Sequence, residues 1–350
     1  MYYQNIVIGA GQAGLSAAFH LQRRGLKPWE DYVVLDANPG PGGAWQHRWR
    51  TLTLGKTHAV ASLPEFPFDN QDPTRPASEV VSEYYGAYER EKNLPVRHDA
   101  EVRAVTHEDG IFTVQLANGG TLQARSIINA TGTSTNPNWP SYPGRFDGPQ
   151  VHTNGFIGPE QFAGQRVLVV GGGASATQFI VQLRAAGVDT LWSTRSEPDW
   201  RTPSADWGIQ VEREVNERTR AGLPPKSVVG ATGLMLNPVM QAAIDSGALV
   251  SRGKIDFLGP HSVHFEDGST EPIDAILWAT GFRHAHDHLR PLHLHTQAGG
   301  ILIAEDSVSA VELPGMYFVG YGASASTLGA TRAGRKAAVA ASKFLAAVPA

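Results

Sequence analysis

The chain has 350 residues, with 29 lysines and arginines against 33 aspartates and glutamates and a formal net charge of -4 at pH 7. The length suits about two domains, and the near balance of charge disfavours a nucleic-acid-binding surface, which needs a clustered basic excess. The absence of cysteine excludes a disulfide scaffold, a cysteine metal site and a C-x-x-C redox pair.

Targeting and membrane signals are also missing. The first strand is expected at residue 3, which leaves no room for the basic and apolar regions of a signal peptide. No stretch approaches the roughly 18 uninterrupted apolar residues that a membrane helix needs. We therefore expect a cytoplasmic enzyme that does not contact a membrane.

The first predicted module begins with a buried strand over residues 3–8. It runs directly into the motif Gly9-x-Gly11-x-x-Gly14 and a helical pattern, the context in which such glycines bind a dinucleotide. The next strand is predicted at 32–35 and is followed by Asp36, about 20 positions beyond the motif, where an acid suits a ribose hydroxyl. The N-terminus of the intervening helix suits the pyrophosphate.

Beyond Asp36 we expect a glycine-rich loop, an aromatic loop, a helix and a meander of three strands. In chain order these cover residues 40–45, 51–68, 79–91, 101–106, 111–116 and 121–128. Asp-Gly at 109–110 and Asn-Gly at 118–119 are typical hairpin turns. The third strand leads into the sequence Ala-Thr-Gly at 130–132.

A second glycine motif follows the predicted strand 167–170. It reads Gly171-x-Gly173-x-x-Ala176, with Ser175 inside it, and the following helix has one apolar face of helical period. A second dinucleotide site is therefore predicted.

The strand expected at 189–193 is followed by Arg195 and Ser196 and carries no acid at its end. An acid there would repel a 2′-phosphate, whereas a guanidinium forms charge-assisted hydrogen bonds with one. The pattern favours NADPH, with NADH as a weaker donor. The alternative is a solvated arginine without a ligand.

The rest of the second half repeats the order of the first. After an irregular, Pro- and Trp-containing segment at 197–250, which a lid or substrate wall would explain, a second meander is predicted at 254–258, 262–265 and 273–278. It leads into a second Ala-Thr-Gly at 279–281. This internal repeat predicts two three-layer, Rossmann-like α/β modules, the second inserted into the first. The expected boundaries are 1–150 with 282–350 for the first module and 151–281 for the second.

The last seventy residues contain histidines, a strand and a helix. Histidines at 284, 286, 288, 293 and 295 have no spacing typical of a metal site, so surface histidines are favoured and no metal is expected. A last strand is predicted at 316–320, and a helix at 331–345 is expected to pack back on the first module.

A further motif, Phe146-x-Gly148-x-x-x-His152-x-x-x-Phe156, lies between the two glycine motifs. It resembles the identifying motif of the flavin-containing monooxygenases, class B flavoprotein monooxygenases, and in particular their short bacterial members. Baeyer–Villiger enzymes carry a variant that ends in Trp-Pro, whereas Ile157 follows Phe156 here.

The resemblance implies a glutathione-reductase-like architecture with FAD in the first module and NADPH in the second. It also implies a (hydro)peroxy adduct at flavin C4a, formed with dioxygen, that oxygenates small sulfides, amines or ketones. Beyond the glycine motifs, Asp36, Arg195 and Ser196, cofactor contacts are expected at Gly43, Ala44, Trp45, Val102, Thr131, Gly132, Thr280, Gly281 and Tyr321.

Two positions depart from the family pattern. Gly55 stands where the family usually has an asparagine that steadies the oxygenated flavin, and His58 is a candidate for a compensating donor. Tyr321 stands where related flavoproteins often have an aspartate that contacts the ribityl chain.

Three functions follow, in order of preference. The first is the FAD- and NADPH-dependent monooxygenase. The second, motivated by Gly55, is a flavin-dependent NAD(P)H oxidase or reductase without productive oxygen transfer. The third is a non-catalytic dinucleotide sensor. The sequence leaves open whether the chain forms a homodimer.

Overall fold

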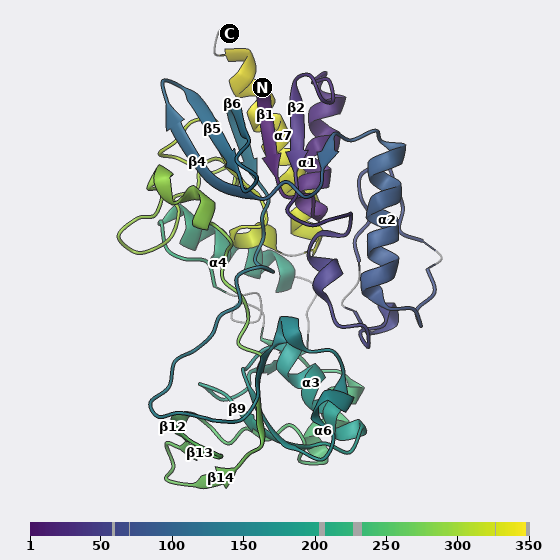
Figure 1. Ribbon diagram of the computed structural model, residues 1–350, viewed down its shortest axis with the longest axis vertical. Helices are drawn as coiled ribbons and strands as arrows, with labels where there is room; N and C mark the ends of the chain where they lie inside the picture. The colour runs from purple at the N-terminus through teal and green to yellow at the C-terminus, as the bar shows by residue number, and fades with distance from the viewer. Residues whose placement is uncertain (58–59, 70, 203–206, 227–232, 326, 348–350) are drawn as a thin grey trace.

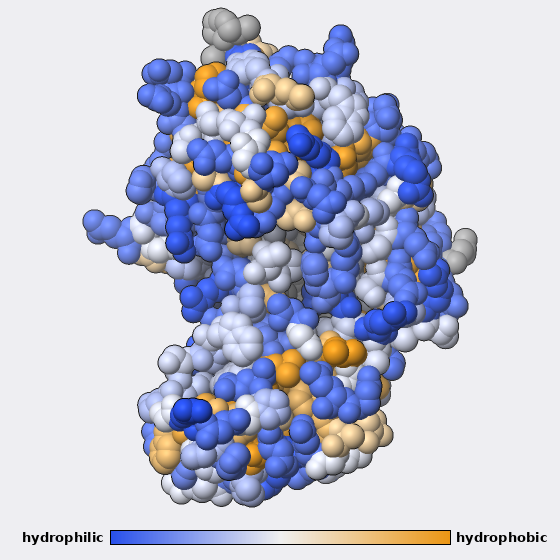
Figure 2. Space-filling view, in the orientation of Figure 1, coloured by the Kyte–Doolittle hydropathy of each residue, from blue (hydrophilic) through white to orange (hydrophobic). Residues whose placement is uncertain are grey.

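The computed structural model describes residues 1–57, 60–69, 71–202, 207–226, 233–325 and 327–347. Two bodies lie one above the other along the long axis, joined by a narrow waist (Figure 1). The same waist is visible in the space-filling view (Figure 2).

The first body is built on a seven-stranded sheet whose path runs β3-β2-β1-β6-β5-β4, with β16 also paired to β6. Its strands are β1 (Tyr2–Ile8), β2 (Tyr32–Leu35), β3 (Val96–Arg97), β4 (Val102–Glu108), β5 (Ile111–Leu116), β6 (Thr121–Asn129) and β16 (Met316–Phe318). β1 pairs parallel with β2 and β6, whereas β4 and β5 are antiparallel. The predicted meander is thus one edge of the same sheet.

Successive side chains of β1 point alternately into two hydrophobic cores, one on each face of the sheet. Val7 belongs to the core under the helices, while Ile6 and Ile8 belong to the core on the opposite face, as the period of two in a strand requires. The helical layer contains α1 (Gln12–Arg23), α2 (Ala77–Glu91) and α7 (Thr327–Ala347).

The C-terminal helix α7 returns to the first body, as predicted. The Ser16 hydroxyl of α1 donates to the Thr331 carbonyl at 2.7 Å. A Cβ on Gly334 would lie 2.5 Å from the Ala13 carbonyl oxygen, so the two helices approach more closely there than any side chain would allow.

The second body has a four-stranded parallel sheet and a small antiparallel meander. Their strands are β7 (Gln150–His152), β8 (Arg166–Val170), β9 (Asp189–Ser193) and β15 (Ala275–Trp278) in the sheet, and β12 (Ile255–Gly259), β13 (Ser262–Phe265) and β14 (Thr270–Pro272) in the meander. Helices α3 (Ala174–Ala185) and α6 (Pro238–Asp245) lie near the opposite face (Figure 1). The two predicted Rossmann-like α/β modules are confirmed.

One predicted strand is corrected. The strand expected at 273–278 does not belong to the meander: β14, which ends at Pro272, closes the meander, and β15, which begins at Ala275, joins the parallel sheet. In the first body one long strand, β6, takes part in both the meander and the parallel sheet, because it pairs antiparallel with β5 and parallel with β1.

The segment predicted to be an irregular insertion, 197–250, contacts both bodies. β10 (Trp200–Arg201) pairs with β11 (Leu234–Met235), and α6 packs on the second core. Helix α4 (Trp207–Arg220) instead reaches the first body, where the Thr219 carbonyl accepts from the Ile303 amide at 3.2 Å.

The interpretation of the five histidines as surface residues is wrong for part of the group. His286 and His288 are 7% and 8% exposed, and the His284 and His286 rings stack 5.4 Å apart. These rings pack against Phe318 and Tyr321, so burial follows from aromatic packing that one sequence does not reveal. His293 and His295 are exposed.

Two features are absent from the described residues. No group of histidine and carboxylate side chains among them is arranged to hold a metal ion. None of the helices in these ranges is long and apolar enough to cross a membrane.

Candidate active site

The glycines of the first motif have different roles. Gly9 has a φ of +105°, and a Cβ there would lie 2.5 Å from the Ala130 carbonyl oxygen. A Cβ on Gly14 would lie 1.8 Å from the Gly9 carbonyl oxygen, whereas one on Gly11 would meet nothing within 4 Å. Gly9 and Gly14 are therefore required by packing, and Gly11 leaves open space at the start of α1.

This open space fits a phosphate group. No side chain caps the N-terminus of α1 and no acid lies in its first turn, so its first amides and the helix dipole are available to an anion. Asp36 is 5% exposed, and its carboxylate accepts from the Ala10 amide at 2.6 Å and the Asn38 amide at 2.8 Å. The remaining lone pairs of this carboxylate suit a ribose hydroxyl.

The glycine-rich loop closes over the first motif. It continues into the short helix η1 (Gly43–His47), where Gly43 has a φ of +51° and a Cβ would lie 2.8 Å from the Gly11 Cα. Trp45 is half-buried against the first core and Ala44 is exposed. The predicted FAD-binding loop is thus in contact with the open glycine.

The second motif repeats this geometry. Gly171 has a φ of +141°, and a Cβ there would lie 2.1 Å from the Ala279 carbonyl oxygen. The Trp192 indole donates to the Gly171 carbonyl at 2.7 Å and fixes the loop. Gly173 precedes α3 and provides no side-chain cap, while Ser175 is half-buried and Ala176 is buried. A second phosphate fits there.

Arg195 and Ser196 lie exposed beyond the end of β9, the strand that neighbours β8 and its glycine loop. Burial raises the pKa of the Tyr142 hydroxyl, and the positive charge of Arg195 opposes part of this shift. Arg195 is therefore close to Tyr142, which stacks on Trp278 at 6.0 Å.

Two extended segments, 131–138 and 280–285, connect the bodies side by side. The Thr280 hydroxyl donates to the Asn138 carbonyl at 2.6 Å, and the Thr131 hydroxyl donates to the Ala285 carbonyl at 2.9 Å. Gly132 and Gly281 have φ values of +62° and +76° with open space at each Cβ position. Both Ala-Thr-Gly sequences thus begin the crossings.

The histidine of the long motif packs on these crossings. His152 is 2% exposed, and its ring lies 5.4 Å from that of Trp139 and 5.0 Å from that of Phe282. Burial lowers the pKa of His152, and the nearby Gly281 backbone and Asn154 side chain oppose part of this shift. Neither contact has good hydrogen-bond geometry, because both ring nitrogens lack a partner among the described residues. The neutral ring therefore acts as an aromatic spacer.

The end of the same motif brings the two bodies into contact. Phe156 lies 6.1 Å from Trp49 of the first body and 4.5 Å from Phe179 of α3, measured between ring centroids. The Thr51 hydroxyl donates to the Gln182 side chain of α3 at 3.2 Å. These contacts form the inner wall of a cleft.

The cleft has a volume of about 580 Å³ and is lined by residues 46–50, 134–135, 154 and 156–157. This volume is within the usual range of small-molecule sites, about 300–1,000 Å³. It is bordered by the FAD-binding loop, the first crossing and the long motif. It is the candidate reaction site.

Other predicted site residues lie outside the cleft lining. Gly55, in η2 (Leu54–Lys56), is exposed, and its amide donates to the Pro73 carbonyl at 2.9 Å. Val102 is half-buried at the start of β4. Tyr321 is 6% exposed, and its hydroxyl accepts from the Ile301 amide at 2.9 Å. His58 lies outside the described residues.

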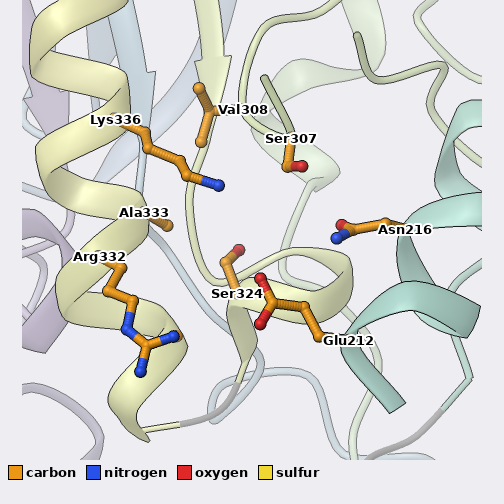
Figure 3. Close-up of a pocket in the computed structure, with 9 residues that line it drawn as sticks. Glu212, Asn216, Ser307, Val308, Ser324, Arg332, Ala333 and Lys336 are labelled. Carbon is orange, nitrogen blue, oxygen red and sulfur yellow. The ribbon is translucent and has the colours of Figure 1, made fainter. Parts of the chain in front are cut away.

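A smaller pocket lies between α4 and α7 and the segments beside them (Figure 3). It has a volume of about 30 Å³ and is lined by Glu212, Asn216, Arg332 and Lys336, among others. A water molecule needs about 10–15 Å³ by this measure, so the pocket holds about two waters and no substrate.

The sequence does not single out Arg48, Trp49, Ser134 or Thr135, which all line the cleft. Their only signal is their place just after the two predicted cofactor loops, because side chains at the ends of such loops converge on a ligand.

Two glycine motifs, each leading into an uncapped helix of a separate body, define a two-dinucleotide oxidoreductase. A family model described as pyridine nucleotide-disulphide oxidoreductase matches residues 6–320, so the chain belongs to this family. The bacillithiol disulfide reductase of Bacillus cereus, 19% identical with a TM-score of 0.74, shares the fold and covers 98% of this chain and 99% of its own.

More similar proteins specify the class. The flavin-containing monooxygenase of Stenotrophomonas maltophilia is 31% identical, with a TM-score of 0.82 over 98% of this chain and 99% of that chain. An indole-3-pyruvate monooxygenase of rice is 27% identical over 90% of this chain and 86% of its own. The protein is a flavin-dependent monooxygenase, a class of enzymes that use FAD, NADPH, dioxygen and a small-molecule substrate.

Proposed function

We propose that the cleft between the two bodies is where this protein oxygenates small sulfides, amines or ketones at the expense of NADPH. The observation that carries the proposal is that two glycine motifs, each leading into a helix without a side-chain cap, lie on opposite bodies that meet at one cleft. The reaction would consume substrate, dioxygen, NADPH and a proton, and release oxygenated substrate, water and NADP⁺.

The proposed cofactor contacts follow from the geometry. Residues 9–14 would bind the FAD pyrophosphate, Asp36 its ribose, and 43–45 would cover it. Residues 171–176 would bind the NADPH pyrophosphate, and Arg195 with Ser196 its 2′-phosphate. When bound, FAD supplies hydride acceptance and dioxygen activation.

The side chains of the cleft would position the substrate and exclude water. Trp49 and Phe156 form an apolar wall, and both are buried. Such a wall protects a reactive site from water. None of the described residues that line the cleft is a carboxylate, so we propose no carboxylate as an acid–base catalyst.

The names of the relatives support the breadth of the substrate class. They include a Baeyer–Villiger monooxygenase of Streptomyces coelicolor and the human flavin-containing monooxygenase 5. The branch that oxidises nitrogen and sulfur and the branch that inserts oxygen beside a carbonyl are therefore both candidates.

A substrate panel tests the proposal. The flavin-loaded protein would be incubated with NADPH, air and an aryl methyl sulfide, a tertiary amine or a cyclic ketone. Products and peroxide would be quantified against the NADPH consumed. We expect the amount of oxygenated product to be nearly equal to the amount of NADPH consumed. Peroxide equal to NADPH with every substrate would instead favour the oxidase or reductase that Gly55 suggests.

A further inference from the structure

We propose that Arg48 binds the carboxylate of the substrate, so that the preferred substrates are apolar molecules carrying one carboxylate at a distance from the oxygenated atom. This inference rests on the proposed monooxygenase function and names the substrate class of the same cleft.

Arg48 is placed at the cleft by η1. Its amide donates to the Trp45 carbonyl at 3.0 Å and ends the short helix. Its guanidinium carbon lies 6.0 Å from the centroid of the Trp45 ring, within the range of a cation–π contact. The side chain is partly buried and lines the 580 Å³ cleft.

The charge of Arg48 has no counterion in the described parts of the chain. No carboxylate, carbonyl or hydroxyl there accepts from its guanidinium, although the chain carries 33 acidic residues. Burial lowers the pKa of this guanidinium, and arginine nevertheless stays protonated in proteins. A partly desolvated cation without a partner is costly unless a ligand supplies the anion.

Arg50, the neighbouring cation, differs from Arg48 because it has a counterion within the protein. Arg50 also lines the cleft but is exposed, and its guanidinium lies 2.6 Å from the Glu79 carboxylate. Its charge is therefore already neutralised within the protein. Arg50 provides a control two residues away in the chain.

The other residues that line the cleft indicate which chemical group the substrate carries beside its carboxylate. Trp49 and Phe156 are 5% and 3% exposed and provide an apolar surface. The Trp49 indole N–H is buried without an acceptor among the described residues, so a second donor at this wall lacks a partner. A planar carboxylate on an apolar body matches a guanidinium fork beside an aromatic surface.

Two other anions are available, the phosphates of the cofactors. The FAD pyrophosphate has the open N-terminus of α1 at Gly11, and NADPH has that of α3 together with Arg195. Because each phosphate group already has donors elsewhere, a substrate carboxylate is the anion left for Arg48.

The test compares para-(methylthio)benzoate with its methyl ester, both oxidised at sulfur to the sulfoxide. We expect kcat/KM to be about 10- to 100-fold higher for the acid, the range given by a hydrogen bond to a charged group. Arg48→Met should abolish the preference and Arg48→Lys should retain part of it. Arg50→Met should leave the acid-to-ester ratio unchanged. Equal kcat/KM for acid and ester in the unsubstituted protein would overturn the inference, whichever variants fold.

A binding measurement separates this inference from the proposed function. Benzoate should quench tryptophan fluorescence of the flavin-loaded protein with a Kd about 10- to 100-fold lower than benzamide, and Arg48→Met should remove the difference. Arg48-dependent benzoate binding without any sulfoxide would support the inference and contradict the monooxygenase function. Sulfoxide formation from acid and ester alike, unaffected by Arg48→Met, would support the monooxygenase function and contradict the inference.

The same variants would also reveal whether Arg48 binds a cofactor phosphate instead of the substrate. If Arg48→Met lost flavin during purification, or raised the KM for NADPH while leaving the acid-to-ester ratio unchanged, Arg48 would serve a cofactor. Either result would overturn the substrate assignment.

Discussion

Individual glycines in the two dinucleotide motifs have separable roles. A Cβ on Gly14 overlaps backbone of the Gly9 turn, whereas a Cβ on Gly11 enters free space at the uncapped end of α1. Gly14 is therefore required by the fold, whereas we propose that Gly11 is required for the approach of a phosphate. In the sequence the motif is one pattern, and the surroundings of each glycine in the fold divide it into two roles.

Gly11→Ala and Gly14→Ala provide a matched pair. Gly11→Ala should leave the melting temperature of the apoprotein unchanged and reduce the flavin bound, because the φ of Gly11 is -76° and the new methyl group meets no protein atom. Gly14→Ala should lower stability by about 3 kcal/mol or more through backbone overlap. Thermal melts and flavin content after purification measure both. A stable, flavin-loaded Gly14→Ala protein would contradict the assignment.

Arg195→Ala should distinguish the two nicotinamide cofactors. Loss of a charge-assisted contact to a 2′-phosphate should raise the KM for NADPH about 10- to 100-fold, with little change for NADH, which lacks this phosphate. Steady-state kinetics with each cofactor measure the difference. An equal rise for both would remove the role assigned to Arg195.

At the scale of elements, the two crossings between the bodies are joined to each other and packed against the long motif. The segments 131–138 and 280–285 are held together by backbone bonds and by side chains such as Thr280 and Asn138. His152 packs on Phe282 of the second segment and on Trp139, the residue that follows the first segment.

Thr280→Val should loosen this junction without loss of flavin, because Thr280 belongs to the module predicted to bind NADPH. It removes the hydroxyl that donates to the Asn138 carbonyl at 2.6 Å, and a lost hydrogen bond of this kind costs about 1 kcal/mol. Denaturant unfolding should show this loss, while flavin content stays unchanged. Wild-type stability together with lost flavin would contradict a purely structural role.

The buried histidines beyond the second crossing predict acid sensitivity. Burial lowers the pKa of His288 to about 4, against about 6.5 in an unfolded chain. Between these values the unfolded state binds more protons, so stability is complete above about pH 6.5 and falls as the pH falls toward 4.

The substitution His288→Gln should weaken this dependence. Glutamine keeps a donor for the Asn129 side chain, which accepts from His288 at 2.8 Å, but does not titrate. The slope of unfolding free energy against pH in this window should fall by up to about 1.4 kcal/mol per pH unit. His293→Gln, at an exposed position, is the control. Identical slopes for all three proteins would contradict the prediction.

Elements with local signals were predictable from the sequence, and elements decided by tertiary packing were not. β2 and β9 match their predicted bounds. For β2 the signal is an apolar run bounded by polar residues, which marks a buried strand. The short strands β3 and β7 exist only through pairing with neighbours. Burial of His286 and the docking of α4 on the first body also depend on distant residues.

The candidate site divides in the same way. The cofactor cradles follow from motifs that fix local backbone geometry. The cleft lies between bodies, and the partners of Arg48 or Arg50 depend on how distant segments meet, which no local pattern specifies. Gly55 illustrates the limit, since its motif position suggested the reaction centre and the structure places it outside the cleft lining.

At the scale of the whole molecule, two similar modules face each other across a waist (Figure 1). In each, a glycine turn lies under an alanine carbonyl of the crossing strand, Ala130 in the first and Ala279 in the second. The repeat therefore directs both uncapped helix ends, and the cofactors that they would bind, toward one junction. Contact of Trp49 with Phe156 and Phe179 closes that junction on one side.

The most direct test of the account uses dioxygen labelled with the heavy isotope of oxygen. The flavin-loaded protein would turn over NADPH with an aryl methyl sulfide under this gas, with mass spectrometry of the sulfoxide and assay of peroxide. The account predicts one labelled oxygen atom in the product and nearly one product per NADPH oxidised. NADPH oxidation with stoichiometric peroxide and no labelled product would contradict it.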